Sequence, residues 1–327
     1  MGAGKDAKAD ARMKRMTGGK GGKMDSNMDK KTDTRRTVDK IATVIFYAAA
    51  GIVLCTLVFL IGYIGLAGWE VLDWEFISSP SKNLAAGGGI LWQIFDSMYL
   101  LVLSMLFTVP IGLGCAVYLS EYARPGPLTS IVNMAVDTLA SLPSIVVGLF
   151  GLLIFVTYVG WGYSILAGTV ALFILTLPVM VSVSLDALRA VPMELREASL
   201  ALGATTWQTV CRVVVPSALP GLITGTLLIA GRVFGEAAVL IYTAGMSAPP
   251  LSWANLNPLE FTSPFNVMRP AETLAVHIWK VNSEGLLPDA RRVADGTAFV
   301  LVIVVLVING LARYLGGRIE RKMKGIS

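Results

Sequence analysis

The sequence predicts an all-α polytopic membrane protein that crosses the bilayer six times. Of its 327 residues, 54% are hydrophobic and only 15% are charged, and the mean hydropathy is +0.67. Several apolar runs reach the roughly 20 residues that a helix needs to cross the hydrocarbon core. These runs are uninterrupted, whereas the strands of an outer-membrane barrel alternate apolar with polar residues. The sequence therefore indicates helices and not a barrel.

Residues 1–40 precede the first apolar run, and we expect them to form a disordered tail in the cytoplasm. They carry twelve Lys and Arg against six Asp and show no apolar periodicity. Basic residues beside a span indicate its cytoplasmic side. The basic carboxyl end, residues 319–327, is predicted to lie on the same side. A basic stretch beside a membrane indicates nucleic-acid binding only weakly, and we expect none.

Six apolar runs are predicted to be the membrane spans, and an even number returns the chain to the side from which it started. They lie at about 41–67, 97–119, 136–159, 163–185, 219–242 and 297–315. The loop at 68–96 is predicted to be exported, because four acids, Asp96 among them, stand there against one Lys. The long mixed segment 243–296 is predicted to be a second extracytoplasmic loop. A Ser-Leu-Pro-Ser sequence at 141–144 breaks the third span.

Residues 186–217 form a polar segment between the fourth and fifth spans, and the span count places it in the cytoplasm. The sequence predicts two short helices there. The first has one face of small and apolar residues at helical spacing, namely Leu195, Ala198, Ser199 and Leu202. Gly203 is predicted to end this helix in the left-handed conformation that glycine adopts cheaply.

The second helix is predicted to begin at Thr205, because Gln208 three residues later completes a capping box. An apolar stripe follows, and Pro216 is predicted to stop the helix. A helix pair of this size cannot bury both faces against itself. We therefore expect one face to pack on the membrane bundle and the small residues to enter a groove on a partner protein. The alternative is an amphipathic loop that lies on the membrane surface.

Some charged residues fall within predicted spans, where charges are costly and usually face a bundle interior or an aqueous path. Arg232 and Glu236 are four residues apart in the fifth span, and Asp137 is in the third. A guanidinium suits a tetrahedral oxyanion such as phosphate or sulfate. We expect Glu236 to hold Arg232 in place and Asp137 to pair with an arginine of this or a partner subunit. The alternative for Arg232 and Glu236 is a purely structural ion pair that ties two helices together.

No metal site is predicted. Cys55, Cys115 and Cys211 show neither paired nor metal-ligand spacing, and His277 is the single histidine of the chain. These residues are expected to serve packing.

The polar segment carries a motif that resembles the EAA loop of ABC importer permeases. Its residues are Glu197, Ala198, Ser199, Gly203, Val213, Val215 and Pro216. Ser199 replaces the second alanine, and valines replace isoleucine and leucine, all of them changes that conserve size. The resemblance implies the type I importer permease fold and a loop that docks into a cleft of a separate ATPase subunit. ATP and Mg²⁺ would be used by that partner, and this chain would be neither an enzyme nor a holder of a cofactor.

Three further blocks, at 136–150, 231–238 and 272–279, resemble the PstA family of phosphate-importer permeases. With the EAA loop, the likeness covers about residues 41–318. It implies that the chain forms a heterodimeric pore with a PstC-like permease and works with a PstB-like ATPase dimer and a PstS-like phosphate-binding protein. By its motif, the transport arginine of the family corresponds to Arg232, and the neighbouring acid to Glu236.

Two other functions are compatible with these patterns. The same machine could import another oxyanion, such as sulfate, molybdate or a phosphonate. A transporter or channel driven by an ion gradient would need no ATPase partner at residues 186–217. A third possibility is a sensing or scaffold role in the membrane.

Overall fold

The computed structural model describes residues 39–82, 87–284 and 288–323. The predictions for residues 1–38 and for the last four residues therefore lie outside the described chain. Contacts divide the chain into two units, 1–63 and 64–327. The helix Asp39–Trp69 runs across this division and is long and apolar enough to cross a membrane. None of its most apolar 18-residue window is buried.

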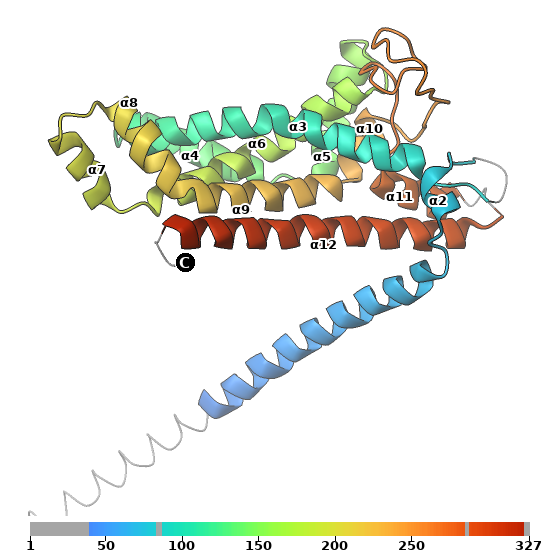
Figure 1. Ribbon diagram of the computed structural model, residues 1–327, viewed down its shortest axis with the longest axis horizontal. Helices are drawn as coiled ribbons and strands as arrows, with labels where there is room; N and C mark the ends of the chain where they lie inside the picture. Colours follow the sequence, from blue (N-terminus) through green and yellow to red (C-terminus); the bar gives the residue numbers. More distant parts are fainter. Residues whose placement is uncertain (1–38, 83–86, 285–287, 324–327) are drawn as a thin grey trace, which may run out of the picture. The chain divides into compact units, whose positions relative to one another are not determined.

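The unit that begins at residue 64 is a bundle of long helices (Figure 1). These are α3 (Leu91–Val117), α6 (Ile165–Arg189), α9 (Val215–Phe234) and α12 (Ala290–Met323). Helix α6 packs against both α3 and α9, and α9 packs against α12. In α6, 61% of the most apolar window is buried, against 6% in α12. Helix α6 is therefore the central helix, and α12 leaves most of its surface for lipid or another subunit.

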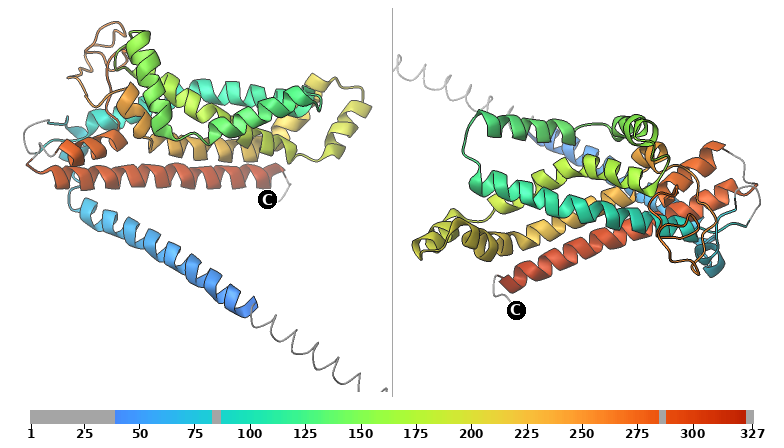
Figure 2. Two further views of the ribbon diagram at one scale, coloured as in Figure 1. Left: turned by 180° about the vertical axis from the view of Figure 1, so that it is seen from behind. Right: turned by 90° about the horizontal axis from the view of Figure 1, so that it is seen from above.

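Shorter helices lie at the two ends of this bundle. One end carries α7 (Met193–Ala201) and α8 (Thr206–Thr209), and the other carries α2 (Trp74–Ser78), α10 (Ala238–Thr243) and α11 (Leu274–Glu284) (Figure 1, Figure 2). Three π-helical segments in the described chain extend other helices: η1 (Tyr118–Tyr122) follows α3, η2 (Leu152–Tyr158) follows α5 (Ser144–Gly151), and η3 (Val210–Val214) precedes α9. We call the end with α7 the coupling end and the other the loop end.

The predicted fold class is confirmed. In the residues that the structure describes, five single helices are long and apolar enough to span a membrane, and a bent pair makes a sixth span if it is counted as one. The span limits differ from the predicted ones at several helix ends, and α9 ends at Phe234 and not at 242. Helix α3 begins at Leu91 and not at 97, and α12 begins at Ala290 and not at 297. The reason at α3 is that its polar first turns, with Gln93 and Asp96, are buried and paired.

The third predicted span, 136–159, is not one straight helix. It consists of α4 (Pro127–Ala140) and the helix formed by α5 (Ser144–Gly151) and η2, which meet at 94°. The bend lies at the predicted Ser-Leu-Pro-Ser break. Pro143 supplies no N–H and disfavours helical backbone at the residue before it. Helix α4 therefore ends at Ala140, and α5 begins in a new direction.

Close approach of α6 to its neighbours depends on glycines. A Cβ at Gly225 of α9 would collide with the side chain of Val183 on α6, and one at Gly112 of α3 would lie 2.6 Å from Cγ of Met180. Helix packing in membranes relies on such small residues, because lipid provides no hydrophobic driving force between helices.

We predict that Gly225→Leu will destabilise the protein by about 1–3 kcal/mol, the usual cost of overpacking. The α6–α9 contact would have to open to admit the larger side chain. Thermal unfolding of the purified protein in detergent would measure the loss. Gly114→Leu is the matched control, because no atom lies within 4 Å of its Cβ position. Equal unfolding temperatures for the two variants would contradict the prediction.

Candidate functional site

The segment 186–217 forms the tip of the coupling end, where a turn joins the short helix α7 to α8, the first turn of a helix that continues through η3 into α9 (Figure 1). Gly203 has φ +86° and no neighbouring atom within 4 Å of its Cβ position. Glycine is therefore required there by backbone conformation and not by space. The predicted left-handed end of the first helix is confirmed.

The second helix begins with the predicted capping box. The backbone N–H of Gln208 donates to Thr205 Oγ1 at 3.3 Å, and the backbone N–H of Thr205 donates to Gln208 Oε1 at 3.0 Å. These two bonds satisfy donors that a helix start otherwise leaves free.

The prediction that Pro216 stops this helix is wrong. Helix continues from Thr206 to Phe234, and Pro216 lies in the first turn of α9. The π-helical turn η3 precedes it, and the N–H of Val215 donates to the carbonyl of Val210, five residues back. The wider turn accommodates a proline, which has no N–H and whose ring crowds an α-helical carbonyl.

The tip of the coupling end is largely exposed. Helix α7 contains no buried residue, and Glu197 and Ala198 are exposed. Leu202 is 90% exposed and Trp207 is 62% exposed. Of the apolar stripe predicted after Thr205, only Val210 and Val214 are buried. A contiguous exposed surface of small, apolar and acidic residues therefore remains available at Glu197–Leu202.

Polar contacts attach α7 to the bundle. Arg196 forms an ion pair with Glu121, and Ser199 Oγ lies 2.9 Å from Thr209 Oγ1. The motif identified Ser199, but sequence alone did not single out Arg196 or Glu121. Their pairing joins positions 75 residues apart in an otherwise apolar chain, and no local pattern reveals such a pair.

The predicted pair of Arg232 and Glu236 does not form. Helix α9 ends at Phe234, so the two residues are not on one helix face. Glu236 Oε1 instead accepts a 3.4 Å hydrogen bond from the N–H of Val239 at the start of α10. Arg232 is exposed and has no hydrogen bond or ion pair with any residue that the structure describes.

Asp137 is exposed on α4 and likewise has no polar side-chain partner within the described ranges. The structure thus brings none of the three predicted intramembrane charges together. Arg232 and Asp137 are exposed at the surface of the chain, where solvent or another subunit can meet them, and Glu236 is partly buried.

The loop end contains a buried ion pair that sequence analysis missed. Arg269 and Asp96 are both fully buried, with Nη2 and Oδ1 2.5 Å apart and Nη1 and Oδ2 3.3 Å apart. Carbonyls of Pro264 and Pro270 accept the remaining guanidinium hydrogen bonds. The prediction that Asp96 belongs to an exported loop is wrong, because it lies inside α3.

The segment around Arg269 also completes the start of α6. The N–H of Ile165 donates to the carbonyl of Arg269 at 2.9 Å, and that of Leu166 donates to Val267 at 2.8 Å. The N–H of Glu272 donates to Asp96 at 3.2 Å. The predicted loop 243–296 is therefore tied to both α3 and α6.

Glu272 extends this network toward α11. Its carboxylate lies 2.9 Å from His277 Nδ1 and 3.4 Å from Lys280 Nζ, and it accepts a 3.3 Å hydrogen bond from Gln93. Nε2 of His277 has no partner among the described residues. The arrangement anchors α11 on α3 through charges that are almost fully shielded from solvent.

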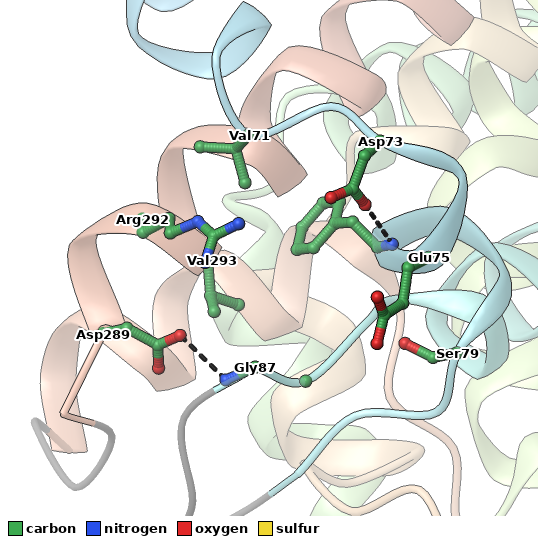
Figure 3. Close-up of a pocket in the computed structure, with 10 residues that line it drawn as sticks. Val71, Asp73, Glu75, Ser79, Gly87, Asp289, Arg292 and Val293 are labelled. Atoms are coloured by element: carbon green, nitrogen blue, oxygen red, sulfur yellow. Dashed lines mark hydrogen bonds between the residues drawn. The ribbon is translucent and has the colours of Figure 1, made fainter.

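A small hollow lies beside this network, between α2 and the start of α12 (Figure 3). Its polar lining includes Asp73, Glu75 and Asp289, with Arg292 at one side. Asp73 accepts from the N–H of Phe76, and Asp289 accepts from the N–H of Gly87 at 3.0 Å. Among the described residues no group of three His, Cys, Asp or Glu side chains is placed to hold a metal ion.

Comparisons with known proteins agree with this geometry. Residues 108–325 match the family described as binding-protein-dependent transport system inner membrane component. The chain is 50% identical over 289 residues to a probable ABC transporter permease protein, YqgI, of Bacillus subtilis, covering 88% of this chain and 98% of that one. It is 31% identical over 297 residues to the phosphate transport system permease protein PstA 1 of Mycobacterium tuberculosis, covering 88% and 91%.

A solved structure shares the fold. It is the MetNI methionine ABC transporter in an inward-facing conformation, with a TM-score of 0.55 and 23% identity over 70% of this chain and 97% of that chain.

We predict that Asp96→Asn will destabilise the protein by about 3–5 kcal/mol, because it leaves the buried charge of Arg269 uncompensated. Thermal unfolding in detergent would measure this. A double variant, Asp96→Leu with Arg269→Met, removes both charges and should lose less stability than the single variant. As a control, Asp295→Asn breaks a 4.0 Å pair with the exposed Arg291 and should cost at most about 1 kcal/mol. A single variant as stable as the control would contradict the prediction.

Proposed function

The chain belongs to the family of binding-protein-dependent transport system inner membrane components, and we propose that it is the permease subunit through which an ATP-driven importer moves inorganic phosphate. It is a multi-pass membrane protein and a permease of an ABC importer, a machine that works with an ATPase and a substrate-binding protein. Phosphate as the cargo, the identity of the partners and the orientation in the membrane are parts of the proposal.

The observation that carries the proposal is the exposed surface of α7 at the coupling end. A helix with no buried residue, fixed by polar contacts and ended by a glycine in the left-handed conformation, is suited to enter a groove of another protein. Glu197, Ala198, Ser199 and Gly203 form this surface and the turn beside it, and Pro216 lies in the helix that continues from it. In the proposal, closure of two ATPase subunits displaces α7 and switches the bundle from inward-facing to outward-facing.

Phosphate is favoured as the cargo by the relatives and by Arg232. One similar protein is named a phosphate transport permease. The guanidinium of Arg232 is exposed on a membrane-spanning helix without a partner in the described chain. A charge there is costly in lipid, so it is expected to face an aqueous path or a second subunit. A transient, hydrogen-bonding positive site suits a passing oxyanion.

The proposed assembly contains a PstC-like second permease, a PstB-like ATPase dimer and a PstS-like phosphate-binding protein. Both termini and the coupling end would lie in the cytoplasm of a bacterium, and the loop end would face the binding protein. ATP and Mg²⁺ would be held by the ATPase, so that this chain requires no cofactor. Glu236 and Asp137 would line the path or contact the second permease.

We predict that Arg232→Gln will lower ATP-dependent phosphate uptake roughly tenfold or more, because one charge-assisted hydrogen bond to the anion is lost. The measurement is uptake of labelled phosphate into proteoliposomes that contain the complete transporter. Arg313→Gln is the control, since it removes an exposed arginine from α12 and should leave uptake unchanged. Unchanged uptake by Arg232→Gln would exclude its contact with the anion.

Competition with other anions tests the cargo separately. Unlabelled phosphate should suppress the uptake, whereas sulfate, molybdate and a phosphonate should not. ATP-dependent uptake of one of those anions in place of phosphate would show that the importer transports a different oxyanion.

We predict that Gly203→Val will prevent the ATPase from co-purifying with this chain. A side chain at φ +86° costs about 1–2 kcal/mol, so the turn that positions α7 should rearrange. Gly160→Val is a matched control, because Gly160 has φ +77° and equally open surroundings but lies between η2 and α6. Equal ATPase recovery with both variants, or transport without ATP, would favour a gradient-driven transporter.

A further inference from the structure

Arg196 occupies a junction between three helices at the coupling end. Its Nη2 lies 3.2 Å from Glu121 Oε1 and donates a 2.7 Å hydrogen bond to the carbonyl of Leu188. The side chains of Arg196 and Glu121 are 14% and 10% exposed. Glu121 also accepts a 2.8 Å hydrogen bond from Ser120. Both members of the pair are thus largely shielded from solvent and held in position.

The two partners of Arg196 belong to different helices of the bundle. Glu121 lies in η1, the extension of α3, and Leu188 lies in the last turn of α6. Helices α3 and α6 pack along each other and share a hydrogen bond between Thr108 and Thr176. The guanidinium of Arg196 on α7 therefore contacts both helices of the central pair, α3 with its extension η1 and α6, at the same time.

Helix α7 contributes no buried residue to the core, so its attachment to α3 and α6 relies on this polar contact. Its other polar link, from Ser199 to Thr209, leads to α8 and from there into α9. A displacement of α7 is transmitted to α9 through the backbone of α8 and η3. It is transmitted to α3 and α6 through the contacts of Arg196 with Glu121 and Leu188. Apart from that side chain, the backbone turn at 190–192 links α7 to α6.

We propose that Arg196 and Glu121 are positioning residues for energy coupling, which make displacement of α7 move α3 and α6 as one body. The proposal rests on the proposed function and adds to it a defined mechanical link. Arg196 need not touch the ATPase or the cargo; it acts through Glu121 and the Leu188 carbonyl. A merely structural pair would change the amount or stability of the complex but not the number of anions moved per ATP.

The test compares Arg196→Gln and Glu121→Gln in the complete transporter, reconstituted in proteoliposomes with its ATPase and binding protein. Phosphate uptake and ATP hydrolysis are measured on the same preparation. We expect both variants to retain the ATPase and hydrolyse ATP, while phosphate moved per ATP falls about fivefold or more, the usual range of a coupling free energy. Arg124→Gln is the control, because Arg124 is exposed near Glu121 and should keep the normal ratio.

Charge reversal supplies an independent test. Glu121→Arg places two like charges together, and adding Arg196→Glu restores an attractive pair although it loses the bond to Leu188. The double variant should recover part of the transport ratio that Glu121→Arg loses. Arg196→Lys, a milder change, should give an intermediate ratio even where the Gln variant assembles poorly. A normal ratio in Arg196→Lys and Glu121→Gln, or no recovery in the double variant, would overturn the proposal.

The outcome is separable from the cargo assignment. If the wild-type complex moves sulfate and not phosphate, the proposed cargo is wrong, and the ratio of sulfate to ATP tests the same link. If the wild-type complex moves its anion without ATP, both proposals fail together.

Discussion

The buried pair of Asp96 and Arg269 is the interaction on which the loop end depends. Removing two charges from water is costly, and the cost is offset only where geometry is good and the remaining donors are bonded. Here the pair is bidentate, and two proline carbonyls accept the other guanidinium hydrogens. Because the carbonyl of Arg269 also caps α6, its position fixes the start of that helix relative to α3.

The same two helices are therefore fastened at both ends by arginines from elsewhere in the chain. Arg269 joins the start of α3 to the start of α6, and Arg196 joins their far ends. Between these points the two helices share apolar core clusters, and Thr108 and Thr176 share a hydrogen bond. The central helix pair is well suited to behave as one rigid body around which the more exposed helices are arranged.

The features that sequence predicted correctly are those encoded over a few residues. Gly203 and the capping box at Thr205 depend on local backbone geometry, so their residue types alone indicate them. The pair of Asp96 and Arg269 spans 173 residues, and neither residue differs in sequence from an ordinary loop charge. Irregular helix geometry is a second limit of prediction from sequence. The predictions for Pro216 and Glu236 both assumed a regular α-helix. A π-helical turn upstream absorbs the proline, and a break at Gly235 separates Glu236 from Arg232.

The π-helical turn at 210–214 limits which insertions and deletions this part of the chain can tolerate. Such a turn holds one residue more than the α-helical turn that it replaces, and each residue rotates a helix by about 100°. Deleting one residue there would regularise the helix and swing α7 about the axis of α9 to another side of the molecule. Insertions and deletions in this stretch are therefore constrained more tightly than substitutions, since they alter the direction in which the coupling surface faces.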